Sequence, residues 1–139
     1  FNVIFVGTKD WHEDEFINVC KKYHGIKAVL ASDFSNNIAI NAVNATATSF
    51  LNAYQTKYGK DAVPASETAL GFDAYMLAIK SIEEAGTTNG TAVRDKLALI
   101  KNFQGASGVI TFSSTGDPKR TINIDEVRGD NFVSIDIIE

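Results

Sequence analysis

Apolar and polar positions along the chain change their period several times, and each period predicts one kind of element. Residues 2–6 form a β-branched and aromatic run that ends at Gly7, which is typical of a buried strand. Between residues 11 and 24 apolar side chains recur at helical spacing, with acidic residues first and lysines last. Residues 26–31 form a second strand candidate. This opening part therefore predicts a β-α-β unit.

The middle of the chain predicts three amphipathic helices, because its apolar residues return every three or four positions. The expected helices cover residues 46–58, 67–85 and 90–101. Their expected apolar faces comprise Phe50, Leu51 and Tyr54, then Phe72, Tyr75, Met76, Ile79 and Ile82, and finally Val93, Leu97 and Ile100. The end of the chain alternates instead, which predicts an antiparallel three-stranded meander at 108–113, 121–127 and 133–137. The fold class is therefore α/β.

Composition narrows the function classes. The 139 residues are within the size of one domain, and 45% of them are apolar, which excludes disorder. The net charge of −4 gives no electrostatic footprint for nucleic acid or anionic lipid. Cys20 is the only cysteine, so no internal disulfide forms. Met76 is the only methionine, and we therefore expect that a further part of the protein precedes Phe1.

Catalytic signals are weak. His12-Glu13 resembles the start of a zinc-binding helix motif, but Phe16 occupies the position of the second histidine, which favours a solvated helix start. Cys20 and His24 lie one helical turn apart, as a nucleophile and its base would. Cys20 also falls on the apolar stripe of the helix, which favours a buried structural cysteine over a small α/β enzyme. We expect no catalytic residue and no metal site.

Three short motifs have both a functional and a structural interpretation. Asn44-Ala-Thr46 and Asn89-Gly-Thr91 fit the glycosylation pattern, and both also fit helix starts. Arg128-Gly129-Asp130 is an adhesion tripeptide by sequence, but here it separates two alternating segments and is read as a hairpin turn.

The segment Gly7-Thr8-Lys9-Asp10-Trp11 carries more information. It leaves the carboxyl end of the first expected strand, where ligands collect in open α/β sheets. A carboxylate, an ammonium and an indole in one loop offer charge pairing together with an apolar cover. The alternative is an ordinary strand-to-helix turn in which Trp11 packs on the helix and Asp10 caps it.

A succession of motifs from the middle to the end of the chain resembles a known family. These motifs are F-L-N-A-Y-Q-T-K-Y-G-K at 50–60, A-L-G-F-D-A-Y at 69–75, I-E-E-A-G at 82–86, V-R-D-K-L at 93–97, F-Q-G-A-S-G-V-I-T-F at 103–112 and G-D-P at 116–118. Their order and spacing resemble the C-terminal portion of type I periplasmic solute-binding proteins, the Leu/Ile/Val-binding group that serves ABC importers.

The resemblance implies a fold of two α/β lobes joined by crossovers, with the ligand closed between them. Residues 1–33 and 109–139 would then belong to the second lobe, and residues 36–104 would be helices of the first lobe. Crossovers are expected near Ser32–Ser35 and Gly105–Gly108. The chain would be one truncated part of a two-lobe protein, and the unpartnered apolar faces of its helices predict self-association or domain swapping.

The resemblance also implies ligand-binding residues. In the family, the loop after the first strand seen here supplies an acidic group for the ligand's α-amino group. Lys9 occupies that position here, with Asp10 one step later and Trp11 in the usual aromatic place, and the crossover near Asp33 and Phe34 lends support. Either Asp10 meets the ammonium through a shifted loop, or Lys9 indicates an anionic ligand. The candidate ligand-binding residues are thus Lys9, Asp10, Trp11 and Phe34.

The function that this resemblance implies is that of a non-enzymatic, cofactor-free binding component that delivers a small polar solute, an amino acid of the branched-chain type, to an ABC importer permease. A periplasmic or extracellular location is expected, with a lipid anchor in the part that precedes the chain. The alternative is the ligand-sensing domain of a receptor or regulator with the same fold, which a membrane-spanning or DNA-binding segment elsewhere in the gene product would indicate.

Overall fold

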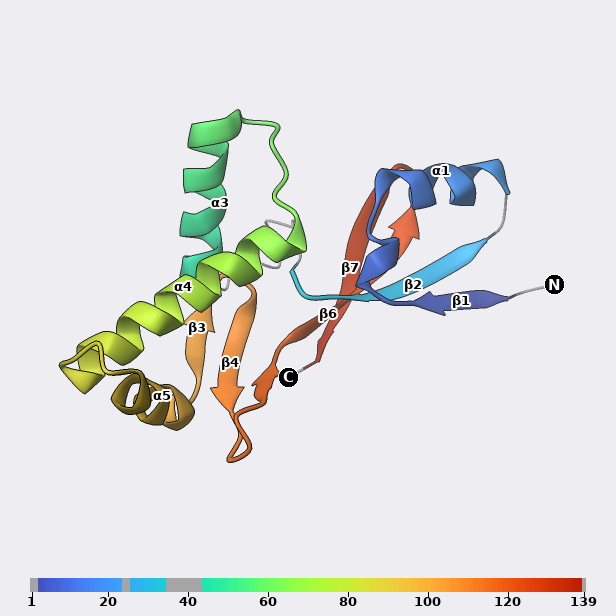
Figure 1. Ribbon diagram of the computed structural model, residues 1–139. Coiled ribbons are helices and arrows are strands. Elements are labelled where there is room, and N and C mark those ends of the chain that lie inside the picture. Colours follow the sequence, from blue (N-terminus) through green and yellow to red (C-terminus); the bar gives the residue numbers. More distant parts are fainter. Residues whose placement is uncertain (1–2, 24–25, 35–43, 139) are drawn as a thin grey trace.

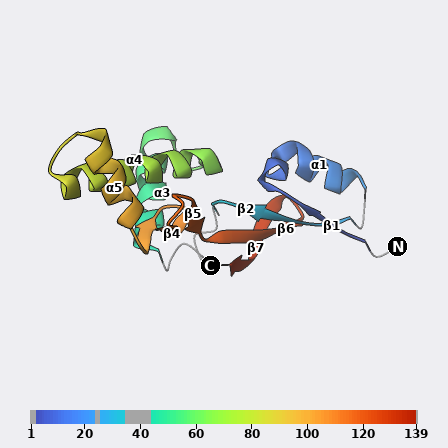
Figure 2. The same cartoon turned by 60° about the horizontal axis from the view of Figure 1, so that its bottom comes forward.

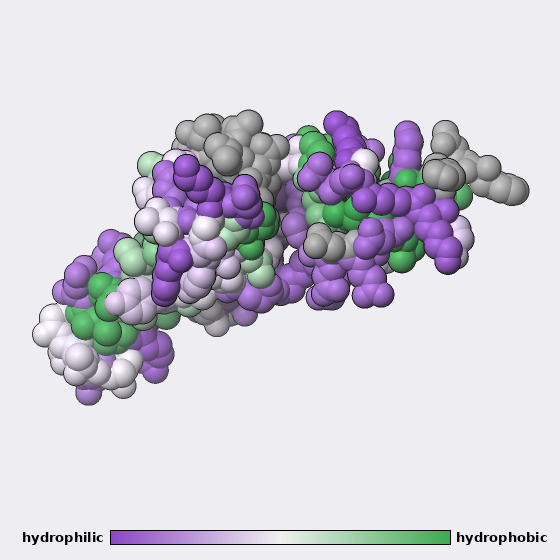
Figure 3. Space-filling view, turned by 90° about the horizontal axis from the view of Figure 1, so that it is seen from above, coloured by the Kyte–Doolittle hydropathy of each residue, from purple (hydrophilic) through white to green (hydrophobic). Residues whose placement is uncertain are grey.

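The computed structural model describes residues 3–23, 26–34 and 44–138, arranged as two bodies side by side. One body holds both ends of the described chain, and the other holds its middle (Figure 1). Seen from above in a space-filling view, the two bodies meet at a narrow waist (Figure 3). Within the described ranges, no helix has both the length and the apolar character needed to cross a membrane.

The first body is a four-stranded sheet with a helix on one face. Strands β1 (Ile4–Gly7) and β2 (Lys27–Ser32) run parallel, joined by a short 3₁₀ helix, η1 (Lys9–Trp11), and by α1 (Asp14–Lys22). Strand β6 (Ile122–Arg128) pairs antiparallel with β2, and β7 (Asn131–Ile138) pairs antiparallel with β6. Helix α1 covers one face of this sheet (Figure 2). The predicted β-α-β unit is confirmed.

The second body packs helices against a small sheet. It contains α3 (Ala45–Tyr58), α4 (Ser66–Ala85), α5 (Gly90–Leu99), β3 (Phe103–Gly105), β4 (Gly108–Phe112) and β5 (Pro118–Arg120). The three predicted helices are confirmed to within two residues at each end. Asn44 and Asn89 act as helix caps, because each side-chain oxygen accepts hydrogen bonds from backbone N–H groups two and three residues later. These hydrogen bonds give both asparagines of the glycosylation-like triplets a structural role.

The expected three-stranded meander is wrong in its pairing. Strand β4 pairs with β3 and β5 in one sheet, whereas β6 pairs with β2 and β7 in the other. The short turn after β4 folds β5 back onto it, and Thr121 then completes this sheet through hydrogen bonds in both directions with Val109. The crossover expected near Gly105–Gly108 is therefore a tight β3–β4 turn, and the chain passes to the other sheet at Thr121. The crossover expected at Ser32–Ser35 ends outside the described residues.

The buried face of α4 also differs from the expected one. Ala69, Asp73, Leu77 and Ser81 are buried, whereas Tyr75 is 64% exposed. The shift follows from Asp73, whose carboxylate accepts hydrogen bonds from the backbone N–H groups of Ala106 and Ser107 and from the Ser107 hydroxyl. These bonds satisfy a charged group inside the body, so the stripe that includes it turns inward.

Hydrophobic packing in the second body divides into two clusters. The cluster nearer the crossover contains Phe34, Phe50, Leu51, Ala69 and Ala106, with Phe72 packed against it. The other contains Leu77, Ile100 and Ile110. Aromatic side chains from α3 and α4 thus meet the segment that follows β2, and this contact fixes where the two bodies join.

Helix α1 buries less than its sequence pattern predicts. Ile17 is its buried apolar residue, whereas Val19 and Tyr23 are 43% and 54% exposed. Cys20 is half-buried and free, and burial raises the pKa of its thiol, which favours the unreactive protonated form. His24, the proposed base for Cys20, lies outside the described residues. Arg128-Gly129-Asp130 forms the β6–β7 hairpin turn, as predicted, with Gly129 at φ 60°.

Candidate functional site

The loop after β1 is shaped by close packing of Trp11. A Cβ atom at Gly7 would lie 2.2 Å from the indole, so only glycine lets the ring approach the backbone here. The Trp11 ring also packs on Phe16 of α1, with their centroids 4.7 Å apart. Trp11 therefore holds the loop against the helix, as the strand-to-helix interpretation predicts, and it keeps part of its surface exposed.

Asp10 does not cap α1. Its carboxylate accepts a hydrogen bond from the Thr8 hydroxyl at 3.0 Å, and the residue that precedes α1 is Glu13, which makes no side-chain cap. Asp10 is exposed. An ionised carboxylate has about four acceptor positions, so Asp10 retains capacity for a further donor.

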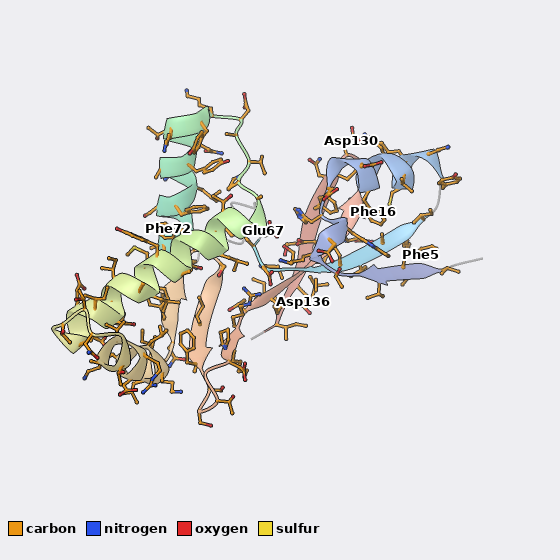
Figure 4. All side chains as sticks on the ribbon, in the orientation of Figure 1. Phe5, Phe16, Glu67, Phe72, Asp130 and Asp136 are labelled. Carbon is orange, nitrogen blue, oxygen red and sulfur yellow. The ribbon has the colours of Figure 1, made fainter. Side chains whose placement is uncertain are left out.

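Lys9 reaches from the first body to the second. Its Nζ donates a hydrogen bond to Oε1 of Glu67 at 3.1 Å and lies 3.7 Å from Oδ2 of Asp33. The bond to Glu67, and then the charges of Glu67 and Asp33, raise the pKa of Lys9. The pKa of Glu67 is lowered by its own backbone N–H and then by Lys9. Glu67 lies at the end of α4 that is nearest to the first body (Figure 4).

Asp33 also pairs with a second cation, the guanidinium of Arg120. Its Oδ1 accepts a hydrogen bond from Nη2 of Arg120 at 2.7 Å, and its side chain is only 9% exposed. Asp33 follows β2, Arg120 ends β5, and Lys9 and Glu67 come from η1 and α4. We call these four residues the charged bridge. It places two cations and two carboxylates at the join between the two bodies.

Phe34 lies next to the charged bridge but is not open to a ligand. It is 1% exposed and packs edge-to-face on Phe50, with centroids 5.7 Å apart. Of the predicted ligand-binding residues, the structure therefore groups Lys9, Asp10 and Trp11 in one loop and places Phe34 in the core behind it. Sequence reasoning missed Glu67 and Arg120. Glu67 lies in the first turn of a helix, a place where acidic residues are common for helix stability alone.

A hollow of about 550 Å³ adjoins this loop. Its lining comes from His12, Glu13 and Ile17, from Val63–Ala65, and from Asp125, Asp130, Asn131 and Phe132. The His12 ring stacks on Phe132 with centroids 4.0 Å apart, and its Nε2 is 3.6 Å from Oδ2 of Asp125. No group of three or more potential metal ligands occurs among the described residues.

The two sheets and the helices between their strands match part of the type I periplasmic-binding fold. The family model for periplasmic binding proteins matches residues 21–131. The chain belongs to the periplasmic binding protein family. A search of curated proteins finds no match.

Solved structures agree with this assignment. The chain is 26% identical to a leucine-binding protein of Thermotoga maritima, with a TM-score of 0.80, and the match covers 99% of this chain and 38% of that one. It is 25% identical to a branched-chain amino acid transporter substrate-binding protein of Streptococcus pneumoniae solved with isoleucine, with a TM-score of 0.74, covering 96% of this chain and 36% of that one. The chain thus spans less than two-fifths of the length of these proteins.

Proposed function

We propose that the protein is the substrate-binding component of an ABC importer and that it binds an amino acid of the branched-chain type. The observation that carries the proposal is the position of the Lys9–Trp11 loop. It leaves the carboxyl end of β1 and faces α4 of the other body, in a fold shared with two proteins described as binding leucine and isoleucine.

The proposed ligand contacts follow from which charges are already paired. The Lys9 ammonium is held by Glu67 and Asp33, whereas the exposed Asp10 carboxylate accepts a hydrogen bond from the neutral Thr8 hydroxyl. Asp10 is therefore the better acceptor for a ligand's α-ammonium group, and exposed Trp11 surface offers an apolar wall for an aliphatic side chain. Lys9 serves mainly to tie the loop to α4.

Calorimetric titration with L-leucine tests this division of roles. Asp10→Ala is expected to weaken leucine binding by about tenfold or more, because it removes a charge-assisted hydrogen bond. Lys9→Ala is expected to change it less than Asp10→Ala does. Asp95→Ala is the matched control, since it removes an exposed carboxylate that pairs with neighbouring Arg94.

The outcomes separate the alternatives. A large loss with Lys9→Ala and none with Asp10→Ala would indicate an anionic ligand that Lys9 binds. Unchanged affinity in both variants would mean that the loop is structural and that the site assignment is wrong. No detectable binding of leucine, isoleucine or valine by the unmodified protein would refute the branched-chain proposal itself.

The proposed location and partner of the protein follow from its membership of the periplasmic binding protein family. We place the protein in the periplasm or outside the cell, with the importer's permease as its partner. We also propose that residues 1–33 and the β6–β7 hairpin belong to one lobe of a longer binding protein, and that α3 to β5 belong to the other. The revised boundary at Thr121 rests on the sheet pairing described above.

A further inference from the structure

His12 connects the Lys9–Trp11 loop to the sheet of the first body. Its backbone N–H donates a hydrogen bond to the carbonyl oxygen of Lys9 at 2.9 Å, so it closes the 3₁₀ turn of the loop. Its side chain reaches β6 and β7, where the ring stacks on Phe132 and Nε2 lies 3.6 Å from Oδ2 of Asp125. The side chain of His12 therefore fixes one end of the loop to the sheet.

Asp125 is a carboxylate in the interior of that sheet. It is 1% exposed, and both of its carboxylate oxygens are closed to solvent. Ser32 faces it from β2 and Ser134 faces it from β7, and both are neutral. Among the described residues, His12 is the basic group within ion-pair distance of this carboxylate. Because a buried carboxylate is costly without a cation, a protonated His12 is the counter-ion that this position requires.

The other charged groups around the imidazole are also mainly acidic. Glu13 and Asp130 line the hollow that His12 adjoins, and Asp130 already pairs with Lys21 at 2.6 Å. From the second body, Glu67 interacts with the charge of His12. The charge of His12 thus acts on the sheet below the loop and on the residue of α4 that bonds to the Lys9 ammonium.

We propose that His12 and Asp125 are positioning residues of the ligand site, whose ion pair holds the Lys9–Trp11 loop in the orientation that binds the ligand. Loss of either charge lets the loop move. The inference rests on the function proposed above, because it assigns regulation by pH to that same site. Asp125 acts through His12 and not by touching the ligand, since its carboxylate is closed to solvent. The effect is on position more than on stability, because desolvation of an ion pair can cost as much as its attraction contributes.

The ion pair is complete only within a limited range of pH. The lower limit is the titration of Asp125, whose pKa burial raises above 3.8, with the charge of His12 opposing the rise. The upper limit is the titration of an imidazole, which ordinarily occurs near about pH 6.5. Below this range Asp125 is neutral, and above it His12 is neutral. Ligand affinity is therefore expected to pass through a maximum between the two limits.

Calorimetric titration with L-leucine across this pH range tests the proposal. The unmodified protein is expected to bind at least about threefold more tightly at about pH 6 than at about pH 8.5. His12→Phe keeps a ring against Phe132 and removes the charge, and Asp125→Asn keeps the shape and removes the charge. Both are expected to abolish the maximum. Asp136→Asn removes an exposed carboxylate of β7 and, as the matched control, is expected to leave the profile unchanged.

A charge-restoring variant provides a test that does not depend on the folding of Asp125→Asn. Lysine keeps its proton at about pH 8.5, and its ammonium can also lie over the Phe132 ring. His12→Lys is therefore expected to retain at about pH 8.5 the affinity that the unmodified protein shows only near about pH 6. A fall in affinity at high pH that is as large in His12→Lys as in the unmodified protein would overturn the proposal.

A measurement without ligand separates this inference from the proposed function. Trp11 is the only tryptophan, so its fluorescence reports on the loop in the ligand-free protein. Its emission is expected to change between about pH 6 and about pH 8.5 in the unmodified protein and to stay constant in His12→Phe and Asp125→Asn. A change that persists in folded Asp125→Asn would overturn the proposal, as would a leucine affinity independent of pH. The expected emission changes without any binding of leucine would support the ion pair and refute the proposed function.

Discussion

Replacing Asp73 by alanine is expected to destabilise the protein more than any exposed charge substitution. Asp73 is buried in the middle of α4 and holds the β3–β4 turn through three hydrogen bonds. The distances are 2.5 Å to the N–H of Ala106, 2.8 Å to the N–H of Ser107 and 2.6 Å to the Ser107 hydroxyl. The contact is close enough that a Cβ atom at Gly105 would lie 2.6 Å from the carboxylate.

The magnitude follows from what the truncation leaves behind. Hydrogen bonds to a charged group contribute about 1.5–3 kcal/mol each, and each buried donor that loses its partner costs about 1–3 kcal/mol. Bonds that share one acceptor are not additive, so the sum is an upper bound. We expect Asp73→Ala to lower the free energy of unfolding by about 3–5 kcal/mol, a large share of the roughly 5–15 kcal/mol typical of domains.

Urea unfolding followed by circular dichroism measures this loss, with Asp95→Ala as the control. Asp95 is an exposed helical carboxylate that pairs with the adjacent Arg94, so its removal is expected to change stability by less than about 0.5 kcal/mol. A loss below about 1 kcal/mol for Asp73→Ala, with an unchanged dependence on urea, would refute the reasoning, because the three bonds would then contribute almost nothing net.

Three other outcomes are expected. Burial raises the pKa of Asp125 above 3.8, so the protonated carboxyl stabilises the fold at low pH, and this contribution is lost as pH rises through the raised value. Thermal melts from about pH 3 to about pH 7 should therefore show the stability of Asp125→Asn increasing relative to that of the unmodified protein. Parallel curves for the two proteins would contradict this. Gly7→Ala should lower stability by about 1–3 kcal/mol and weaken leucine binding by displacing Trp11, whereas Gly90→Ala, with open space around it, should do neither. Light scattering should show self-association through apolar surface on α3 and α4, where Phe50, Tyr54, Tyr58 and Phe72 line part of a hollow of about 580 Å³. A monodisperse monomer would count against it.

Local patterns predict most of the elements because local physics determines them. The asparagine caps at Asn44 and Asn89 and the glycine at the β6–β7 turn act within a few residues, and each lies where its sequence indicates. Sheet membership is different, since the sequences of β4 and β6 do not indicate which strand each pairs with. The tight pairing of β4 with β3 and β5, together with the bonds between Thr121 and Val109, places β4 in the other sheet from β6.

The faces of helices were predicted less well than the helices themselves. A pattern that counts apolar residues places Tyr75 and Met76 inside α4, whereas the buried stripe contains Asp73 and Ser81. A charged residue four positions from Ala69 and from Leu77 was the available signal, because a carboxylate on such a stripe needs a partner. That partner is the backbone of a turn more than thirty residues away, which no local pattern reveals.

The residues of the candidate site show the same difference between what local sequence predicts and what it does not. The loop Lys9–Trp11 could be found because it follows a strand and concentrates charge, but Glu67, Arg120 and Asp125 are separated from it by many residues. Phe34 was expected at the ligand and lies instead in the core, since an aromatic residue beside a crossover suits either place. Ion pairs between residues of the two bodies can be recognised only in the three-dimensional structure.

The charged bridge therefore connects recognition with the relative position of the two bodies. Lys9 belongs to the loop proposed to bind the ligand, and the same ammonium bonds to Glu67 on the other body. The Glu67 side chain is 67% exposed, so this link is weak and easily exchanged, whereas the link from Arg120 to Asp33 is much better buried. Because of this difference in exposure, separating the two bodies would cost less at the Lys9–Glu67 pair than at the Arg120–Asp33 pair.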